Sequence, residues 1–199
     1  MTLSSLPAAL AAAIVAAAAV PAFSWLPDLL VRAAFVGWAS YDHSGAGKQA
    51  ALRSSAALAF GVVMAWLVAI SIVTGALPLS TSLTTAICAG IASFLIVMAL
   101  RMPYLSIVPA TFYGFASTFA YLSLSPNAFT VSAITTPSWS NAISCVPISL
   151  LIGTGLGMVH GLAGEGSCCR QRRARARVEP GRSGAVKHAR AFVPEMVGP

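Results

Sequence analysis

Six apolar segments occupy most of this 199-residue chain. They cover approximately residues 4–22, 26–41, 54–77, 82–101, 104–124 and 143–163, and the second is the shortest. A helix needs about 20 mostly apolar residues to cross the roughly 30 Å hydrocarbon core of a bilayer. Because backbone groups cannot stay unpaired in lipid, and because the runs are continuous rather than alternating, each segment is expected to be a helix. The sequence therefore predicts an all-α membrane protein with six transmembrane helices.

The scarcity of charge supports this class. Charged residues make up 9% of the chain and hydrophobic residues 57%, whereas a soluble domain carries about 25% charged residues. Of the 12 Lys and Arg residues, only Arg32, Lys48, Arg53 and Arg101 precede residue 165. We therefore divide the chain into a transmembrane domain, residues 1–164, and a basic tail, residues 165–199. The tail cannot bury enough apolar area to fold alone and is expected to be disordered.

The basic residues between the segments predict the orientation. Lys48 and Arg53 follow the second segment, Arg101 ends the fourth, and the basic tail follows the sixth, while the other connections carry no basic residue. With six spans, all the basic connections lie on one face. The positive-inside rule then predicts that both termini are cytoplasmic.

Two matching motifs lie halfway along the second and fifth segments. The first hexad, Phe35–Ser40, reads Phe-Val-Gly-Trp-Ala-Ser, and the second hexad, Phe112–Ser117, reads Phe-Tyr-Gly-Phe-Ala-Ser. Six helices divide into two triplets, and an odd number of spans in each triplet inverts the second copy. The hexads therefore predict two inverted three-helix repeats. Chance similarity in a composition rich in Ala, Ser and Phe is the alternative.

A weaker echo links the third and sixth segments. Leu58-x-x-Gly61-x-x-x-Ala65 resembles Leu150-x-x-Gly153-x-x-x-Gly157. The third member of each proposed triplet is where this second match is expected.

The small residues of the hexads predict a close helix crossing. Gly37 and Gly114 would let the two hexads approach each other near the bilayer midplane, where transporters built from repeats hold their solute. The hexads are then candidates for a solute pathway or a helix crossing, and the packing crossover of a closed bundle is the alternative. The candidate residues are Phe35, Gly37, Ser40, Phe112, Gly114 and Ser117.

Arg32 joins these candidates as the one charge well inside a predicted span. Asp28 lies four residues earlier, and on one helical face the two could pair. An arginine at this depth is costly unless it is paired or its side chain reaches the interface. Recognition of an anionic or polar solute by Arg32 is the alternative interpretation.

Two further features keep more than one interpretation. One helical face carries a glycine at every fourth residue: Gly153, Gly157 and Gly161. This face is a groove for internal helix packing, a homo-oligomer interface or the lining of a pore. The long uncharged connection 125–142 is either a surface loop or a flap over an external opening.

The sequence offers little for catalysis. It contains no G-x-S-x-G or H-E-x-x-H motif, and Gly45–Lys48 lacks the rest of a P-loop. We therefore predict that the protein is not an enzyme and that it needs no cofactor and no metal. The basic tail favours anionic lipid over nucleic acid as its partner, because that surface lies closest to it.

The fifth segment also carries a family resemblance. Val108–Gly114 followed by Ser117–Ala120 resembles the small bacterial inner-membrane proteins of the YcdZ type, catalogued as domain-of-unknown-function family 1097. Phe35-x-Gly37 and Gly45–Lys48 fit this family too, and the resemblance covers roughly residues 5–164. It implies a multi-pass protein of the bacterial inner membrane with no established activity, so it assigns no functional residues.

The expected function is a channel or carrier for a small solute. The matched hexads motivate this expectation, because such crossings form the solute sites of transporters built from repeats. A non-transporting accessory or assembly protein, whose glycine faces bind other helices, is the alternative.

Overall fold

The computed structural model describes residues 6–178, and it describes side chains for residues 8–162. This part of the chain is helical and contains no strand. Its elements are α1 (Leu6–Ser24), α2 (Val31–His43), α3 (Lys48–Val73), α4 (Thr81–Met98), the 3-10 turn η2 (Ala99–Arg101), α5 (Val108–Leu124), α6 (Val131–Thr135) and α7 (Ala142–Val178). The all-α prediction is confirmed.

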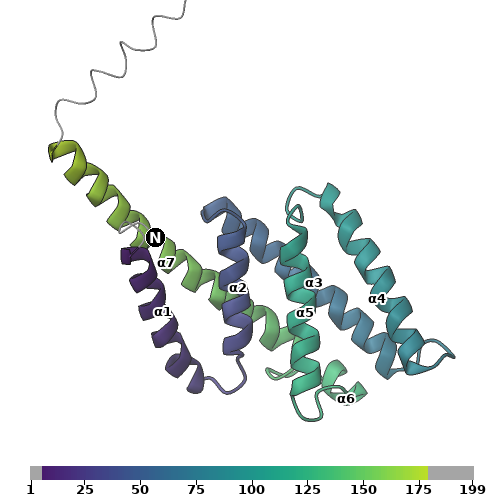
Figure 1. The fold of residues 1–199 in the computed structure, drawn as a ribbon. Helices are drawn as coiled ribbons and strands as arrows, with labels where there is room; N and C mark the ends of the chain where they lie inside the picture. The colour runs from purple at the N-terminus through teal and green to yellow at the C-terminus, as the bar shows by residue number, and fades with distance from the viewer. Residues whose placement is uncertain (1–5, 179–199) are drawn as a thin grey trace, which may run out of the picture.

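The long helices alternate in direction. In Figure 1, α1, α3 and α5 run downward, and α2, α4 and α7 run upward. The connections 44–47 and 99–107 therefore lie at one end of the bundle, which we call the upper end. The connections 25–30, 74–80 and 125–141 lie at the opposite, lower end.

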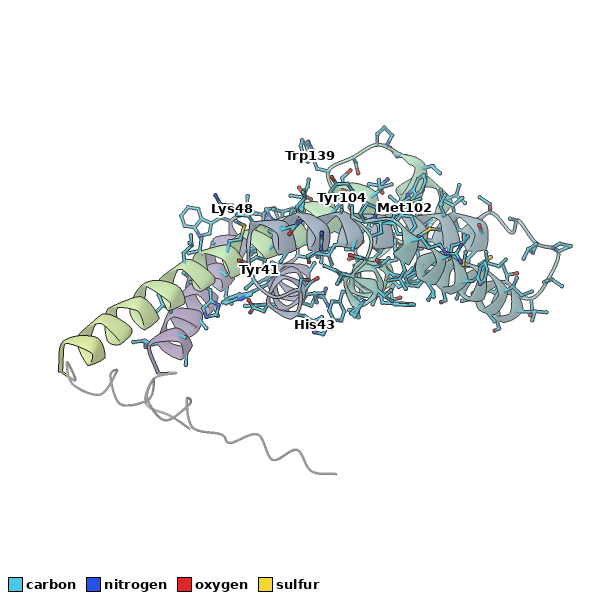
Figure 2. The ribbon with its side chains drawn as sticks, turned by 90° about the horizontal axis from the view of Figure 1, so that it is seen from above. Tyr41, His43, Lys48, Met102, Tyr104 and Trp139 are labelled. Carbon is cyan, nitrogen blue, oxygen red and sulfur yellow. The ribbon has the colours of Figure 1, made fainter. Side chains whose placement is uncertain are left out.

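Four helices form the centre of the bundle. In Figure 1, α2 and α5 lie in front of α7 and α3, and the view from above in Figure 2 shows the same two layers. The closest neighbours are α2 with α7 and α5 with α3, while α1 packs against α7 and α4 packs against α3 at the two edges. The molecule is thus a four-helix centre with one flanking helix on each side.

Within the described residues, three helices are long and apolar enough to cross a membrane. They are Lys48–Val73, Thr81–Arg101 and Ala142–Leu162. The apolar part of α1 is shorter, and α2 and α5 have 13 and 17 residues. At about 1.5 Å per residue, α2 is about 20 Å long, because the chain turns before Val31 rather than continuing the helix from residue 26.

The core lies where the four central helices meet. Its fully buried members are small or aliphatic side chains, which let the helices approach closely: Ala33, Ala57, Leu58, Val62, Ala110, Cys145, Val146 and Leu150. Large apolar side chains also cover the outside, and on α4 Leu83, Ile91 and Phe94 are 48%, 56% and 65% exposed. A surface of this kind is compatible with lipid and unfavourable in water.

The connection 125–141 is a folded cap rather than a loose loop. It contains α6, and Ile134 and Ala128 pack with Ala69 and Leu122 of the bundle in a second buried cluster. The Trp66 indole N–H donates to the Ile134 carbonyl at 3.2 Å. The packing argues against a flap that swings free, since moving the cap would expose this cluster.

The last helix is longer than the predicted sixth span. α7 continues to Val178, so the backbone of residues 165–178, which we expected to be disordered, is helical. Arg, Ala and Gln dominate residues 170–177, and all three have high helix propensity, which the burial argument ignored. Residues 179–199 lie outside the described part of the chain, so disorder there stays a prediction.

Candidate functional site

Each hexad glycine lies at a helix crossing. A Cβ atom on Gly37 of α2 would overlap the backbone of Leu150 in α7, and a Cβ atom on Gly114 of α5 would overlap the backbone of Leu58 in α3. Real Cβ atoms essentially never come within 3.0 Å of such atoms. Only glycine therefore fits at either crossing.

Each partner helix also contributes a glycine to the same crossing. A Cβ atom on Gly153 of α7 would overlap the backbone of Ala34, and a Cβ atom on Gly61 of α3 would overlap the backbone of Thr111. Ala34 and Thr111 both lie three residues before their hexad glycine, and Gly153 and Gly61 both lie three residues after their leucine. The two crossings are thus built from corresponding positions, and we call this arrangement the reciprocal glycine contacts.

The prediction that the two hexads meet each other is wrong in its partners. The glycine of each hexad packs on the third helix of the other triplet, not on Gly114 or Gly37. Spacing within α2 and α5 correctly identified surfaces for close approach, but it carried no information on which helix would use them.

A cleft lies between α2 and α5, where two of the candidates come together. Its volume is about 130 Å³, and its lining residues are Leu30, Arg32, Ala33, Val36, Ser117, Ala120, Tyr121 and Leu124. Arg32 and Ser117 give it one guanidinium and one hydroxyl. Tyr121 adds a second hydroxyl, which donates to the Ser140 carbonyl of the cap. The other walls are aliphatic, so the cleft suits a small solute with one polar end.

Arg32 occupies a different position from the one predicted. Because α2 begins at Val31, Arg32 lies in its first turn, close to the lower end of the bundle. Asp28 lies outside the helix, in the turn before it, and lines a separate groove. The expected pairing on one helical face is therefore wrong, and Arg32 is left exposed at the cleft.

The remaining hexad candidates have structural surroundings. The Ser40 hydroxyl is buried and shares a 2.6 Å hydrogen bond with Ser54 of α3, so its hydrogen bonding is directed into the bundle. Phe35 is 37% exposed and stacks on Trp38 with ring centroids 6.2 Å apart. Phe112 is half-buried and is not part of the cleft lining.

The glycine face of α7 is covered by α2. Besides the contact of Gly153 with Ala34, a Cβ atom on Gly157 would lie 2.7 Å from the Tyr41 ring, and one on Gly161 would lie 3.7 Å from the Tyr41 hydroxyl. Of the three interpretations considered for this face, internal packing matches the structure.

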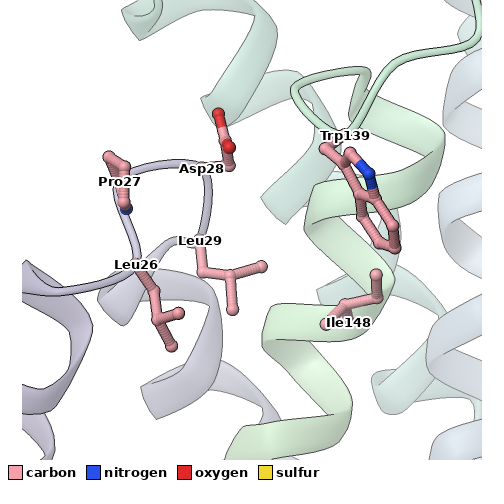
Figure 3. Close-up of a pocket in the computed structure, with 6 residues that line it drawn as sticks. All are labelled: Leu26, Pro27, Asp28, Leu29, Trp139 and Ile148. Carbon is pink, nitrogen blue, oxygen red and sulfur yellow. The ribbon is translucent and has the colours of Figure 1, made fainter.

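A second groove, at the lower end, was not predicted. Figure 3 shows Asp28 and Trp139 on opposite sides of it, with Leu29 and Ile148 on its walls. Trp139 belongs to the cap and Asp28 to the turn before α2, which lie 111 positions apart in the chain. Sequence patterns within one helix could not have joined these two residues.

Comparison with known proteins adds one match. The family model described as "Protein of unknown function (DUF1097)" matches residues 9–165, which is most of the chain. No curated protein and no solved structure matches it.

Proposed function

The chain belongs to the DUF1097 family of proteins of unknown function, and we propose that it carries a small anionic or polar solute across a bacterial inner membrane. In this proposal six spans form two inverted three-helix halves, and the solute passes along the cleft between α2 and α5. The reciprocal glycine contacts are the observation on which the proposal rests.

The contacts favour an inverted repeat because exchanging the two proposed halves turns each glycine contact into another observed contact. Replacing α2 by α5 and α7 by α3 turns the Gly37–Leu150 contact into Gly114–Leu58, and it likewise turns Gly153–Ala34 into Gly61–Thr111. The flanking helices follow the same exchange, since α1 lies on α7 and α4 lies on α3. Corresponding helices run in opposite directions in Figure 1, as inverted halves must.

Six spans with cytoplasmic termini predict a definite pattern in topology reporters. Alkaline phosphatase fused after Ala76 or Asn127, at the lower end, should be active because these points are periplasmic. Fusions after Ala46 or Met102, at the upper end near Lys48 and Arg101, should be inactive. A green fluorescent protein fusion at each point is the matched control, with the opposite pattern. Activity at both ends would contradict the inverted arrangement.

The α2–α5 cleft is the proposed path because it lies between the two crossed helix pairs. Its volume of about 130 Å³ leaves room for a small solute only. A small monocarboxylate fits this space with its charge at Arg32 and its hydrocarbon part near Val36 and Ala33. Ser117 and Tyr121 supply the additional hydrogen-bonding groups.

Replacing Arg32 with leucine should lower the flux of small monocarboxylates through reconstituted liposomes at least tenfold, because the cleft then has no positive charge. Arg32→Lys should retain part of the flux, since the charge remains but the two-pronged hydrogen bonding of the guanidinium is lost. Flux is measured by the osmotic response of the liposomes to acetate, lactate and glycerol.

Arg101→Leu is the matched control, because Arg101 is also exposed but lies at the upper end away from the cleft. Equal flux for Arg32→Leu and the unmodified protein, at equal abundance, would give Arg32 a structural role only. No flux of any solute, together with stable co-purification of another membrane protein, would favour the accessory or assembly role instead.

The basic tail has a proposed partner as well. Eight Lys and Arg residues follow residue 165, and with cytoplasmic termini they meet the anionic inner leaflet, at about 1 kcal/mol per basic residue near the surface.

A further inference from the structure

The groove at the lower end is formed by three separate segments. Leu26, Pro27, Asp28 and Leu29 come from the turn between α1 and α2, Trp139 comes from the cap, and Ile148 comes from α7. Its volume is about 260 Å³. Four of its six lining residues are aliphatic, so the groove offers a hydrocarbon surface with one carboxylate and one indole.

Trp139 is held beside this groove without being covered. It is 76% exposed, although a tryptophan side chain usually buries most of its surface in a folded protein. The segment on its C-terminal side is fixed, because Ser140 accepts a hydrogen bond from Tyr121 and the buried Asn141 donates to the carbonyls of Ile134 and Thr136 at 2.9 Å each. The backbone next to Trp139 is therefore held in place, and its indole lines the groove.

Asp28 gives the groove a negative charge and no matching cation. The six lining residues include no Lys, Arg or His, and Arg32 lines the neighbouring cleft instead. Asp28 is exposed at the rim of the groove. A ligand that complements this groove must bring a positive charge of its own.

The indole restricts the kind of cation. An ammonium group is attracted to the face of a tryptophan ring, and tryptophan is the strongest of the aromatic residues in this interaction. The volume lies just below the roughly 300–1,000 Å³ of sites for drug-sized ligands, so a small ion fits better than a two-chain lipid. We propose that this groove binds a small aliphatic ammonium ion, with Asp28 as counter-ion, Trp139 as aromatic wall, and Leu29 and Ile148 against the hydrocarbon part.

The test is a calorimetric titration of the full-length protein in dodecyl maltoside with butyltrimethylammonium. Asp28→Asn should weaken binding at least about tenfold because the charge–charge contact is lost, while Asp28→Glu, which keeps the charge, should bind within about threefold of the unmodified protein. Trp139→Leu should weaken binding about fivefold through loss of the cation–π contact. Trp25→Leu is the matched control, since Trp25 is 85% exposed but does not line the groove.

Each of the following results would overturn the proposal. They are equal binding by Asp28→Asn and the unmodified protein, equal binding of hexanoate or hexanol, or weakening by Trp25→Leu as large as that by Trp139→Leu. Competition by added phosphatidylethanolamine but not by phosphatidylglycerol would identify a lipid headgroup as the occupant and would likewise overturn it. Asp28→Glu and the elution volume of each variant in gel filtration distinguish lost binding from lost folding. The result is independent of the flux through the Arg32 cleft, so either proposal can fail alone.

Discussion

Gly153→Ala is expected to be among the most damaging single substitutions in this protein. A Cβ atom at this position would overlap the backbone of Ala34, and backbone atoms cannot move aside as the end of a flexible side chain can. Overpacking typically costs about 1–3 kcal/mol and occasionally more, and we expect the upper end of that range here. The measurement is the apparent melting temperature and the monodisperse yield of the detergent-solubilised protein.

Gly155→Ala is the matched control on the same helix. No atom lies within 4 Å of a Cβ built on Gly155, so this change should leave stability unchanged or raise it by up to about 1 kcal/mol through helix propensity. Gly61→Ala, at the corresponding crossing of α3 with α5, should be about as damaging as Gly153→Ala. If Gly153→Ala melted like Gly155→Ala, the close crossing of α2 and α7 would be wrong.

Asn141→Ala is expected to release the cap from the bundle. The Asn141 amide donates to the carbonyls of Ile134 and Thr136, and its side-chain oxygen accepts from the Ile143 N–H at 3.1 Å, which caps the start of α7. Loss of an N-cap costs about 0.5–2 kcal/mol, and the Thr136 carbonyl left without its partner adds about 1 kcal/mol, whereas the Ile134 carbonyl keeps the hydrogen bond from Trp66. We therefore expect about 1.5–3 kcal/mol in total from these terms.

Release of the cap should be seen as faster cleavage of residues 125–141 by thermolysin. The melting temperature is measured on the same samples. Asn141→Asp should have an intermediate effect, because it keeps the capping acceptor and loses both donated bonds. Ser138→Ala is the control, since the Ser138 hydroxyl is exposed and bonds only to exposed Ser140. Protection of the segment in Asn141→Ala would show that the apolar packing of Ile134 and the hydrogen bond from Trp66 are enough to hold the cap.

The long helices could be predicted from the sequence because each one contains a continuous apolar run. The predicted segments overlap α1 to α5 and α7, and α3 and α4 lie within a few residues of their predicted limits apart from the start of α3. The hexads and the glycine repeat of α7 also marked surfaces for close approach, since small residues in a membrane helix have few other uses. These patterns are local to one helix, so they can be read without knowing how the helices pack together.

The partners of those surfaces could not be predicted, because nothing within a segment encodes them. Gly37 could pack closely against the backbone of any neighbouring helix. Its contact with Leu150 is determined by the assembly of the whole bundle. The start of α2 was missed because hydropathy continues through Leu29 and Leu30 although the chain turns there. Trp139 and Asp28 form a groove only after the cap has packed. Nothing in the sequence near either residue predicts that the other will lie beside it.

The connection that follows α5 is much longer than the one that follows α2. Residues 125–141 join α5 to α7, whereas only residues 44–47 join α2 to α3. One end of the bundle therefore presents a folded platform containing α6, Asn141 and Trp139, whereas the other end has the short glycine turn 44–47 and the connection 99–107. For the transport proposed above, such unlike faces imply different barriers for influx and efflux, so flux should be faster in one direction than in the other.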